Sequence, residues 1–160
     1  MNPEEASKIP VWLQNRLVIG AKEVVFFPDL NLRVKAKVDT GAKTSSLHAY
    51  EITTELRGNQ QWVSFTTTSE DPDEGKPIRV SQPVYDKRLI RSSNGEESQR
   101  YVIRLWMQLG PVKQRIEVTL ADRSKMKYPM LLGRVALEER FLVAPGASYL
   151  LGATESQHQT

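Results

Sequence analysis

The chain of 160 residues contains no cysteine and only two histidines, His48 and His158. The lack of cysteine excludes disulfides, thiol nucleophiles and cysteine-ligated zinc, and it fits a reducing compartment. There is no His-Glu-x-x-His sequence and no Gly-rich phosphate loop, the signatures of a zinc protease and of an ATP site. The sequence therefore predicts no metal and no other cofactor. The alternative is a zinc site built from His48 and carboxylates such as Asp39, although a lone histidine is more often a hydrogen-bonded structural residue.

Long apolar runs are also missing. No window approaches the roughly 18 apolar residues that a membrane-spanning helix needs. The first residues are polar and acidic, unlike the apolar stretch of a secretory signal. We therefore expect a cytoplasmic protein with no membrane partner.

The chain has little charge of one sign in excess, since 22 basic and 19 acidic residues give a net charge of +3. The basic residues are dispersed, and only Arg33, Lys35 and Lys37 form a row, which is typical of one solvated face of a strand. A nucleic-acid-binding protein usually has a basic stripe with interleaved aromatic residues. The sequence thus predicts no nucleic-acid partner and a slight preference for acidic partners.

Helical periodicity is scarce, whereas short runs of β-branched and aromatic residues between turn residues are frequent. This pattern predicts an all-β barrel or sandwich, with one short helix at 135–140 near the C-terminus. We expect a single folded domain at 17–152, a loosely ordered lead-in at 1–16 and a mobile tail at 153–160. The expected strands are two around Gly20 within 17–27, and one each at 32–38, 61–68, 83–91, 100–109, 113–120, 141–143 and 148–151, the last two forming a hairpin.

The tripeptide Asp39-Thr40-Gly41 follows the alternating segment 32–38, which is typical of a half-buried strand. A carboxylate at a strand end, beside a glycine that permits a sharp turn, suits an acid/base catalyst. By itself the tripeptide is more often ordinary turn chemistry than a catalytic loop. A second stretch, the apolar run Met130–Gly133 followed by Arg134, favours the catalytic interpretation.

In pepsin-type aspartic proteases an apolar-apolar-Gly segment braces the Asp-Thr-Gly loop, and this chain has both segments in that order. From about residue 20 to 151 it resembles a bacterial family of retropepsin-like aspartic endopeptidases, which have also been labelled ATP-dependent zinc proteases. The resemblance implies a closed acid-protease barrel. The segments that carry it are 36–49, 91–95, 118–123 and 128–134.

By this resemblance Asp39 is the catalytic carboxylate, Thr40 bonds across a dimer and Gly41 lies against the substrate. Leu132, Gly133 and Arg134 would support the loop. One chain supplies one aspartate, so the resemblance implies a homodimer in which two carboxylates share a proton and activate water. Family members often lie beside peptide ligases of the ATP-grasp type, which implies a functional link to such a ligase.

Two features depart from retroviral enzymes. Their acidic residue two positions after the glycine is here Lys43, which would repel Arg134 unless Asp122 or Glu138 lies between them. Gly133 also follows Gly41 by 92 positions, a longer separation than in retroviral enzymes. The extra length falls between residues 51 and 100, where 69–77 and 92–97 are candidate tips of a substrate-covering flap.

A peptide groove is expected just past the catalytic loop, near the flap. Arg88 and Arg91 lie beside the expected flap and could hold a substrate carboxylate, although solvated surface charges are the simpler interpretation of these arginines. The serines are likewise more simply ordinary loop residues. With Lys43, these arginines favour an acidic peptide. The candidate groove residues are Ala42, Lys43, Thr44, Ser45, His48, Arg88, Arg91, Ser92 and Ser93.

Two functions therefore remain open. The first is a homodimeric aspartic peptidase that cleaves a peptide or isopeptide bond. The second is a non-catalytic peptide-binding module that keeps the acid-protease fold, with Asp39 as a binding or structural carboxylate. The intact Asp-Thr-Gly-Ala sequence favours the first, whereas the lone aspartate and Lys43 favour the second.

Overall fold

The computed structural model describes residues 15–69, 76–91 and 94–151, together with the isolated positions Asn2 and Pro10. Most of the expected lead-in at 1–16 and the whole expected tail at 153–160 lie outside these residues. Within the described ranges the chain forms strands and two 3₁₀ turns, and no helix there is long and apolar enough to cross a membrane. The elements are β1 (Leu17–Ile19), β2 (Lys22–Phe27), η1 (Pro28–Leu30), β3 (Leu32–Asp39), β4 (Ser45–His48), β5 (Tyr50–Arg57), β6 (Gln60–Thr68), β7 (Pro77–Pro83), β8 (Asp86–Arg91), β9 (Glu97–Leu109), β10 (Val112–Ala121), β11 (Met130–Gly133), η2 (Arg134–Ala136) and β12 (Phe141–Val143).

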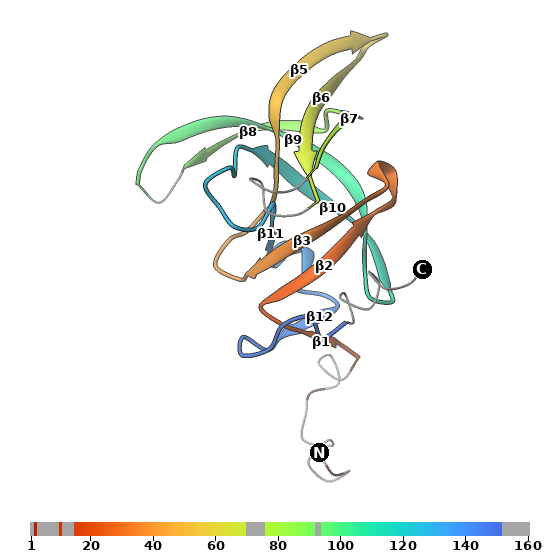
Figure 1. Ribbon diagram of the computed structural model, residues 1–160, viewed down its shortest axis with the longest axis vertical. Helices are drawn as coiled ribbons and strands as arrows, with labels where there is room; N and C mark the ends of the chain where they lie inside the picture. Colours follow the sequence, from red (N-terminus) through yellow and green to blue (C-terminus); the bar gives the residue numbers. More distant parts are fainter. Residues whose placement is uncertain (1, 3–9, 11–14, 70–75, 92–93, 152–160) are drawn as a thin grey trace.

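Seven strands form the main sheet, in the order β10-β4-β11-β3-β2-β9-β8 (Figure 1). An additional pairing of β10 with β9 leads the sheet back on itself. The join between β2 and β9 rests on one residue pair, Phe26 with Gln108, so the barrel is not closed by continuous ladders all the way round. The all-β prediction is confirmed, and the full closure of the barrel is not.

The alternation of apolar and polar residues in these strands explains the core. In β3 the inward residues Leu32, Val34 and Ala36 are buried, while the intervening Arg33 and Lys37 face solvent. Strands β2, β9 and β10 alternate in the same way, because successive side chains in a strand point to opposite faces. Burying one face of each strand leaves the opposite face of the sheet polar.

Part of the long segment between Gly41 and Gly133 forms a separate three-stranded sheet, in the order β5-β6-β7. Figure 1 shows β5 and β6 rising away from the main sheet as a curved arm. Val63 and Phe65 of β6 are fully buried in the core, whereas Leu56 of β5 is 74% exposed. The arm is therefore anchored through β6 and open to solvent along β5.

The C-terminal part differs from the sequence expectation. The predicted hairpin of 141–143 with 148–151 is wrong, because β12 pairs in parallel with β1 and the later segment is not a strand. The short helix expected at 135–140 is not confirmed either, since a three-residue 3₁₀ turn, η2, occupies its start. The strand expected at 83–91 is interrupted, and β7 and β8 belong to different sheets.

The buried carboxylate of Glu23 explains where 148–151 goes instead. Glu23 lies on the inward face of β2 and is 0% exposed, although it is a charged residue type. Its oxygens accept the backbone N–H groups of Gly20 at 2.8 Å, Leu150 at 2.9 Å and Leu151 at 3.3 Å. These bonds fasten the C-terminal segment to β2 without a strand ladder.

Candidate functional site

Asp39 is the last residue of β3, and the strand pairing fixes its position. β3 and β11 run in parallel, with Val38 opposite Leu132 and Asp39 opposite Gly133. The Asp39 side chain is half-exposed, and its Oδ1 accepts the Gly41 N–H at 2.9 Å. Its carbonyl oxygen accepts the Ala42 N–H at 3.2 Å. The carboxylate is thus oriented by its own loop while it stays open to solvent.

The end of β11 holds this loop in place, and Gly133 allows the close approach. A Cβ at Gly133 would lie 2.8 Å from the carbonyl carbon of Thr44 and 3.0 Å from the Ala42 oxygen. The Gly133 N–H donates to the Ser45 hydroxyl at 3.0 Å, and the Arg134 N–H donates to the Ala42 oxygen at 2.9 Å. Leu132, Gly133 and Arg134 therefore contact the loop that they were expected to support.

The two cations Lys43 and Arg134 are not bridged by a carboxylate. Arg134 instead places Nη1 3.3 Å from the Gly41 carbonyl oxygen. Asp122 accepts the Ser124 N–H at 2.8 Å, and a hydrogen bond from Ser124 is the main reason that its pKa lies below the usual range. Among the described residues no ion pair joins either cation to Asp122 or Glu138. The guanidinium thus binds the main chain of the loop that follows Asp39.

His48 lies inside the main sheet. It ends β4, which runs between β10 and β11, and its side chain is only 2% exposed. Nδ1 accepts the Arg123 N–H at 2.8 Å, so this nitrogen carries no proton. Ser45 of the same strand is buried too. Burial leaves the His48 side chain almost no exposed surface, and the predicted role of both residues as substrate contacts stays a prediction.

Arg123 is a charged neighbour of Asp39 that the sequence analysis did not single out. Burial lowers the pKa of Arg123, the Arg100 cation lowers that pKa further, and the Asp39 carboxylate raises it. The side chain is held by a bond from Nε to the Tyr128 oxygen at 3.1 Å. Its place in the 118–123 segment that resembles the endopeptidase family was the one available signal. His48 therefore holds the backbone of Arg123, whose guanidinium pKa is raised by the Asp39 carboxylate.

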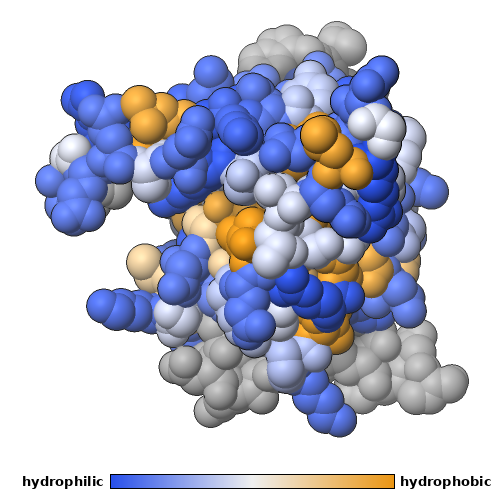
Figure 2. All heavy atoms as spheres, turned by 90° about the horizontal axis from the view of Figure 1, so that it is seen from above, coloured by the Kyte–Doolittle hydropathy of each residue, from blue (hydrophilic) through white to orange (hydrophobic). Residues whose placement is uncertain are grey.

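A groove of about 980 Å³ lies beside the catalytic loop, between β8, β10 and η2. In Figure 2 the hairpin of β8 and β9 projects on the left, with a hollow between it and the body. Four predicted substrate-binding residues line the groove, namely Lys43, Thr44, Ser45 and Arg88. Asp39 does not line it, although Lys43 follows Asp39 by only four positions.

The remaining candidates lie elsewhere. Arg91 pairs with Glu97 at 3.0 Å near the end of the hairpin and does not line the groove. Ala42 belongs to the catalytic loop, and Thr40 is exposed beside it. Ser92 and Ser93 lie outside the described residues. Of the two candidate flap regions, 69–77 lies mostly outside the described residues. The described part of the second, 94–97, leads into β9, whose partner β8 borders the groove.

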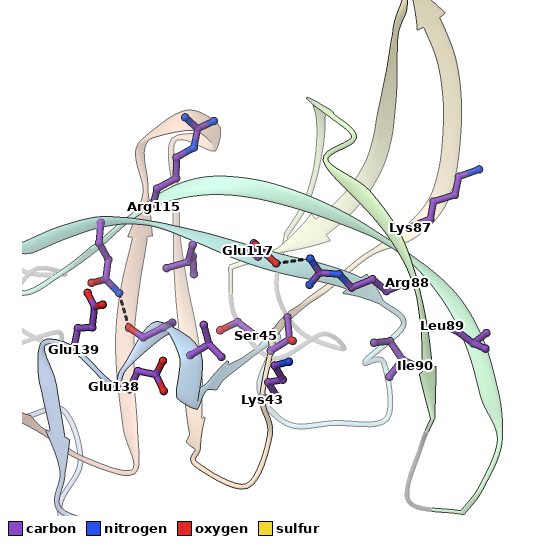
Figure 3. A pocket seen from close by; sticks show the side chains of 15 residues that line it. Lys43, Ser45, Lys87, Arg88, Leu89, Ile90, Arg115, Glu117, Glu138 and Glu139 are labelled. Carbon is purple, nitrogen blue, oxygen red and sulfur yellow. Dashed lines mark hydrogen bonds and ion pairs between the residues drawn. The ribbon is translucent and has the colours of Figure 1, made fainter.

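The charges in the groove are mixed (Figure 3). Arg88 is held by two carboxylates, Glu117 at 2.6 Å and Asp86 at 2.9 Å, and the bond to Glu117 is the main cause that raises its pKa. Figure 3 places Glu138 and Glu139 at one end and Lys43 with Ser45 near the middle. Three other cations line the groove with no carboxylate partner among the described residues, namely Lys43, Lys87 and Arg115.

We expect purified protein to contain no stoichiometric zinc, because Nδ1 of His48 accepts the Arg123 N–H and the proton of the neutral ring is then on Nε2, which leaves neither nitrogen ready to bind a metal. No group of three or more His, Cys, Asp or Glu side chains within the described ranges could hold a metal ion. Elemental analysis and chelator treatment measure this directly. One zinc per chain that is lost in His48→Ala would restore the zinc-site interpretation.

The chain is similar to a known protein family and to a solved structure. The family model described as "Retropepsin-like aspartic endopeptidase RimB" matches residues 18–154. A crystal structure of a Legionella pneumophila protein of unknown function superposes with a TM-score of 0.71 at 29% identity, over 84% of this chain and 98% of that one.

Curated relatives named "Probable alpha-L-glutamate ligase" are 40% identical in Desulfotalea psychrophila and 42% identical in Shewanella pealeana. The matches cover 88% and 86% of this chain, but this chain spans only 30% of the length of each relative. The family match over nearly the whole chain agrees with the loop of Asp39 and its brace at Gly133. The chain therefore belongs to the RimB-like family of retropepsin-like aspartic endopeptidases.

Proposed function

We propose that the protein is an aspartic-type endopeptidase whose active form is a homodimer. The observation that carries this proposal is the half-exposed Asp39 carboxylate at the end of β3, held by the Gly41 N–H and braced by Gly133. A rigid strand end fixes the carboxylate, and the short loop leaves its outer oxygen available to water. Such positioning is what acid/base catalysis needs.

The chemistry requires two such carboxylates that share one proton. In the proposed dimer the ionised Asp39 takes a proton from water as the water oxygen attacks the peptide carbonyl carbon. The protonated Asp39 of the second copy gives its proton to the carbonyl oxygen. Collapse of the tetrahedral intermediate breaks the C–N bond, the leaving amine takes a proton, and the products are a carboxylic acid and an amine. Arg123 is close enough to Asp39 for this carboxylate to raise the pKa of the guanidinium.

Activity per chain is expected to fall when the protein is diluted, because a monomer supplies one Asp39. Initial rates measured over a dilution series, with light scattering at each concentration, test this. Mixing wild type with an excess of Asp39→Asn chains should also lower the rate, because mixed dimers lack one carboxylate. Constant activity per chain from a protein that scatters as a monomer would refute the dimer.

The substrate class that fits best is an acidic, glutamate-rich peptide or tail. Lys43 lies in the groove without a carboxylate partner among the described residues, and Lys87 lines the same groove. The named relatives are glutamate ligases, and a ligase that adds glutamate makes a product of this chemistry. A link to a peptide ligase of the ATP-grasp type follows as part of the proposal.

Lys43→Glu is expected to weaken cleavage of glutamate-rich peptides about tenfold or more, since a charge-assisted bond contributes roughly 1.5–3 kcal/mol. A peptide library compared between wild type and Lys43→Glu measures the change in preference. Lys76→Glu is the matched control and should leave the preference unchanged, since Lys76 is an exposed lysine just before β7 and does not line the groove. A wild-type preference for apolar or basic peptides would rule out the acidic substrate.

The second candidate is a peptide-binding module without catalysis. The contact of Arg134 with the Gly41 oxygen favours it, because the guanidinium there binds main chain instead of the acidic side chain expected in retroviral dimers. On this interpretation wild type and Asp39→Asn bind the same acidic peptide and neither cleaves it. Mass spectrometry of the recovered peptide separates the two candidates.

A further inference from the structure

The outer face of β10, β9, β2 and β3 gathers cations that lie far apart in the sequence. Residues directly opposite each other in an antiparallel pair point to the same side of the sheet. The register sets Arg115 opposite Trp106 and Lys113 opposite Gln108. Gln108 is in turn opposite Phe26, and Phe26 is opposite Arg33. A single surface therefore crosses all four strands.

Five exposed cations occupy this surface, which we call the basic face. The carboxylates that border it are already engaged. Glu117 pairs with Arg88 at 2.6 Å, and Oδ2 of Asp29 accepts the Trp106 N–H at 2.9 Å. The cations are Arg33, Lys37, Arg104, Lys113 and Arg115.

Aromatic rings alternate with the cations. Trp106 is 40% exposed, with the Lys113 ammonium 5.7 Å and the Arg115 guanidinium 5.9 Å from its ring centroid. Tyr85 is 50% exposed, with Arg104 at 4.9 Å. Arg33 lies 4.9 Å from the Phe26 ring. Each ring on the basic face thus has a cation beside it.

We propose that the basic face binds single-stranded nucleic acid. Phosphates would pair with the cations, and unstacked bases would stack on Trp106 and Tyr85. Proteins that bind single strands without strong sequence preference combine these two elements. An acidic polypeptide would use the same cations, but its carboxylates gain nothing from the exposed aromatic faces. Arg115 also lines the groove beside Lys43, but the other cations and the rings of the basic face do not. The inference therefore does not depend on the proposed peptidase activity.

Fluorescence anisotropy with labelled oligo(U), oligo(dT), duplex DNA and poly-glutamate tests the proposal. Both single strands should bind more tightly than the duplex and than poly-glutamate, and the affinity should fall as salt rises. Whichever of oligo(U) and oligo(dT) binds more tightly identifies the natural polymer as RNA or DNA. Arg33→Glu should weaken binding about tenfold and reduce its salt dependence.

Trp106→Lys separates stacking from charge, because it removes a ring and adds a cation. Stacking predicts roughly tenfold weaker binding of the single strands, within the range measured for base–aromatic stacking. Trp62→Lys is the matched control, since Trp62 also packs under an arginine, Arg57 at 4.2 Å, but lies on the arm. It should leave binding unchanged.

Three results would overturn the proposal. They are no binding of the single strands at low salt, tighter binding of poly-glutamate than of oligo(U), and unchanged or improved binding in Trp106→Lys. The second result would assign the basic face to an acidic polypeptide.

Discussion

Replacing Asp39 by asparagine is expected to lower the rate of peptide hydrolysis by about 10²–10⁴-fold, the contribution of a positioned acid/base group. In the wild type the Gly41 N–H donates to Oδ1 of Asp39 at 2.9 Å. Asparagine keeps the shape of the side chain and an oxygen that can accept the same N–H. It cannot take up or share the proton. The loop and its brace at Gly133 should therefore persist while catalysis is lost.

Initial rates on the best peptide from the library, together with urea unfolding, measure both parts of this expectation. The free energy of unfolding should stay within about 0.5 kcal/mol of wild type. Glu55→Gln makes the same chemical change on the exposed arm and should alter neither quantity. If the rate of Asp39→Asn stays within a few-fold of the wild-type rate, another residue catalyses the reaction.

Glu23→Ala is expected to lower the free energy of unfolding by about 2–4 kcal/mol. The substitution removes the acceptor of three backbone N–H groups, and a buried donor left without a partner costs about 1–3 kcal/mol. Glu23→Gln should cost less, because one oxygen remains. The C-terminal segment at 148–151 should detach first, since its bonds to β2 depend on this carboxylate.

Urea unfolding gives the stability, and limited proteolysis near residue 150 reports detachment of the segment. Glu55→Ala is the control, since the Glu55 side chain is 57% exposed and pairs only with the nearby Arg57. Its stability should change by about 0.5 kcal/mol or less. If Glu23→Ala is as stable as Glu55→Ala, the buried carboxylate does not hold the C-terminal segment.

The strands of the main sheet were predictable from alternation, because each buries one face only. Segments 32–38, 100–109 and 113–120 became β3, β9 and β10 with small changes at their ends. The prediction of a C-terminal hairpin is wrong because composition alone suggested a strand at 148–151. Two backbone N–H groups of this segment donate to the Glu23 side chain instead of to a strand. A glutamate in an apolar strand gives no sign in the sequence of whether it faces inward.

The catalytic loop was predictable because its glycines and its brace are local sequence features. Arg123 was missed as a neighbour of Asp39, since 84 positions separate them and only tertiary packing brings the charges together. The basic face was missed for a related reason. Its cations come from three strands, β3, β9 and β10, and the pairing register decides which of them share a side. The expectation of no nucleic-acid partner rested on their dispersal along the chain.

The arm also has a consequence for behaviour at high concentration. β5 pairs with β6 on one side only, and an unpaired strand edge can join the same edge of another copy. Here the register slips between Tyr50 and Thr53, and the charged residues Glu51, Glu55 and Arg57 lie along the strand. Irregular, charged edges disfavour such sheet-to-sheet aggregation. Edge-to-edge pairing of two copies of this chain through β5 is therefore disfavoured. The surface around Asp39 is separate from this edge and remains open to the proposed two-fold contact.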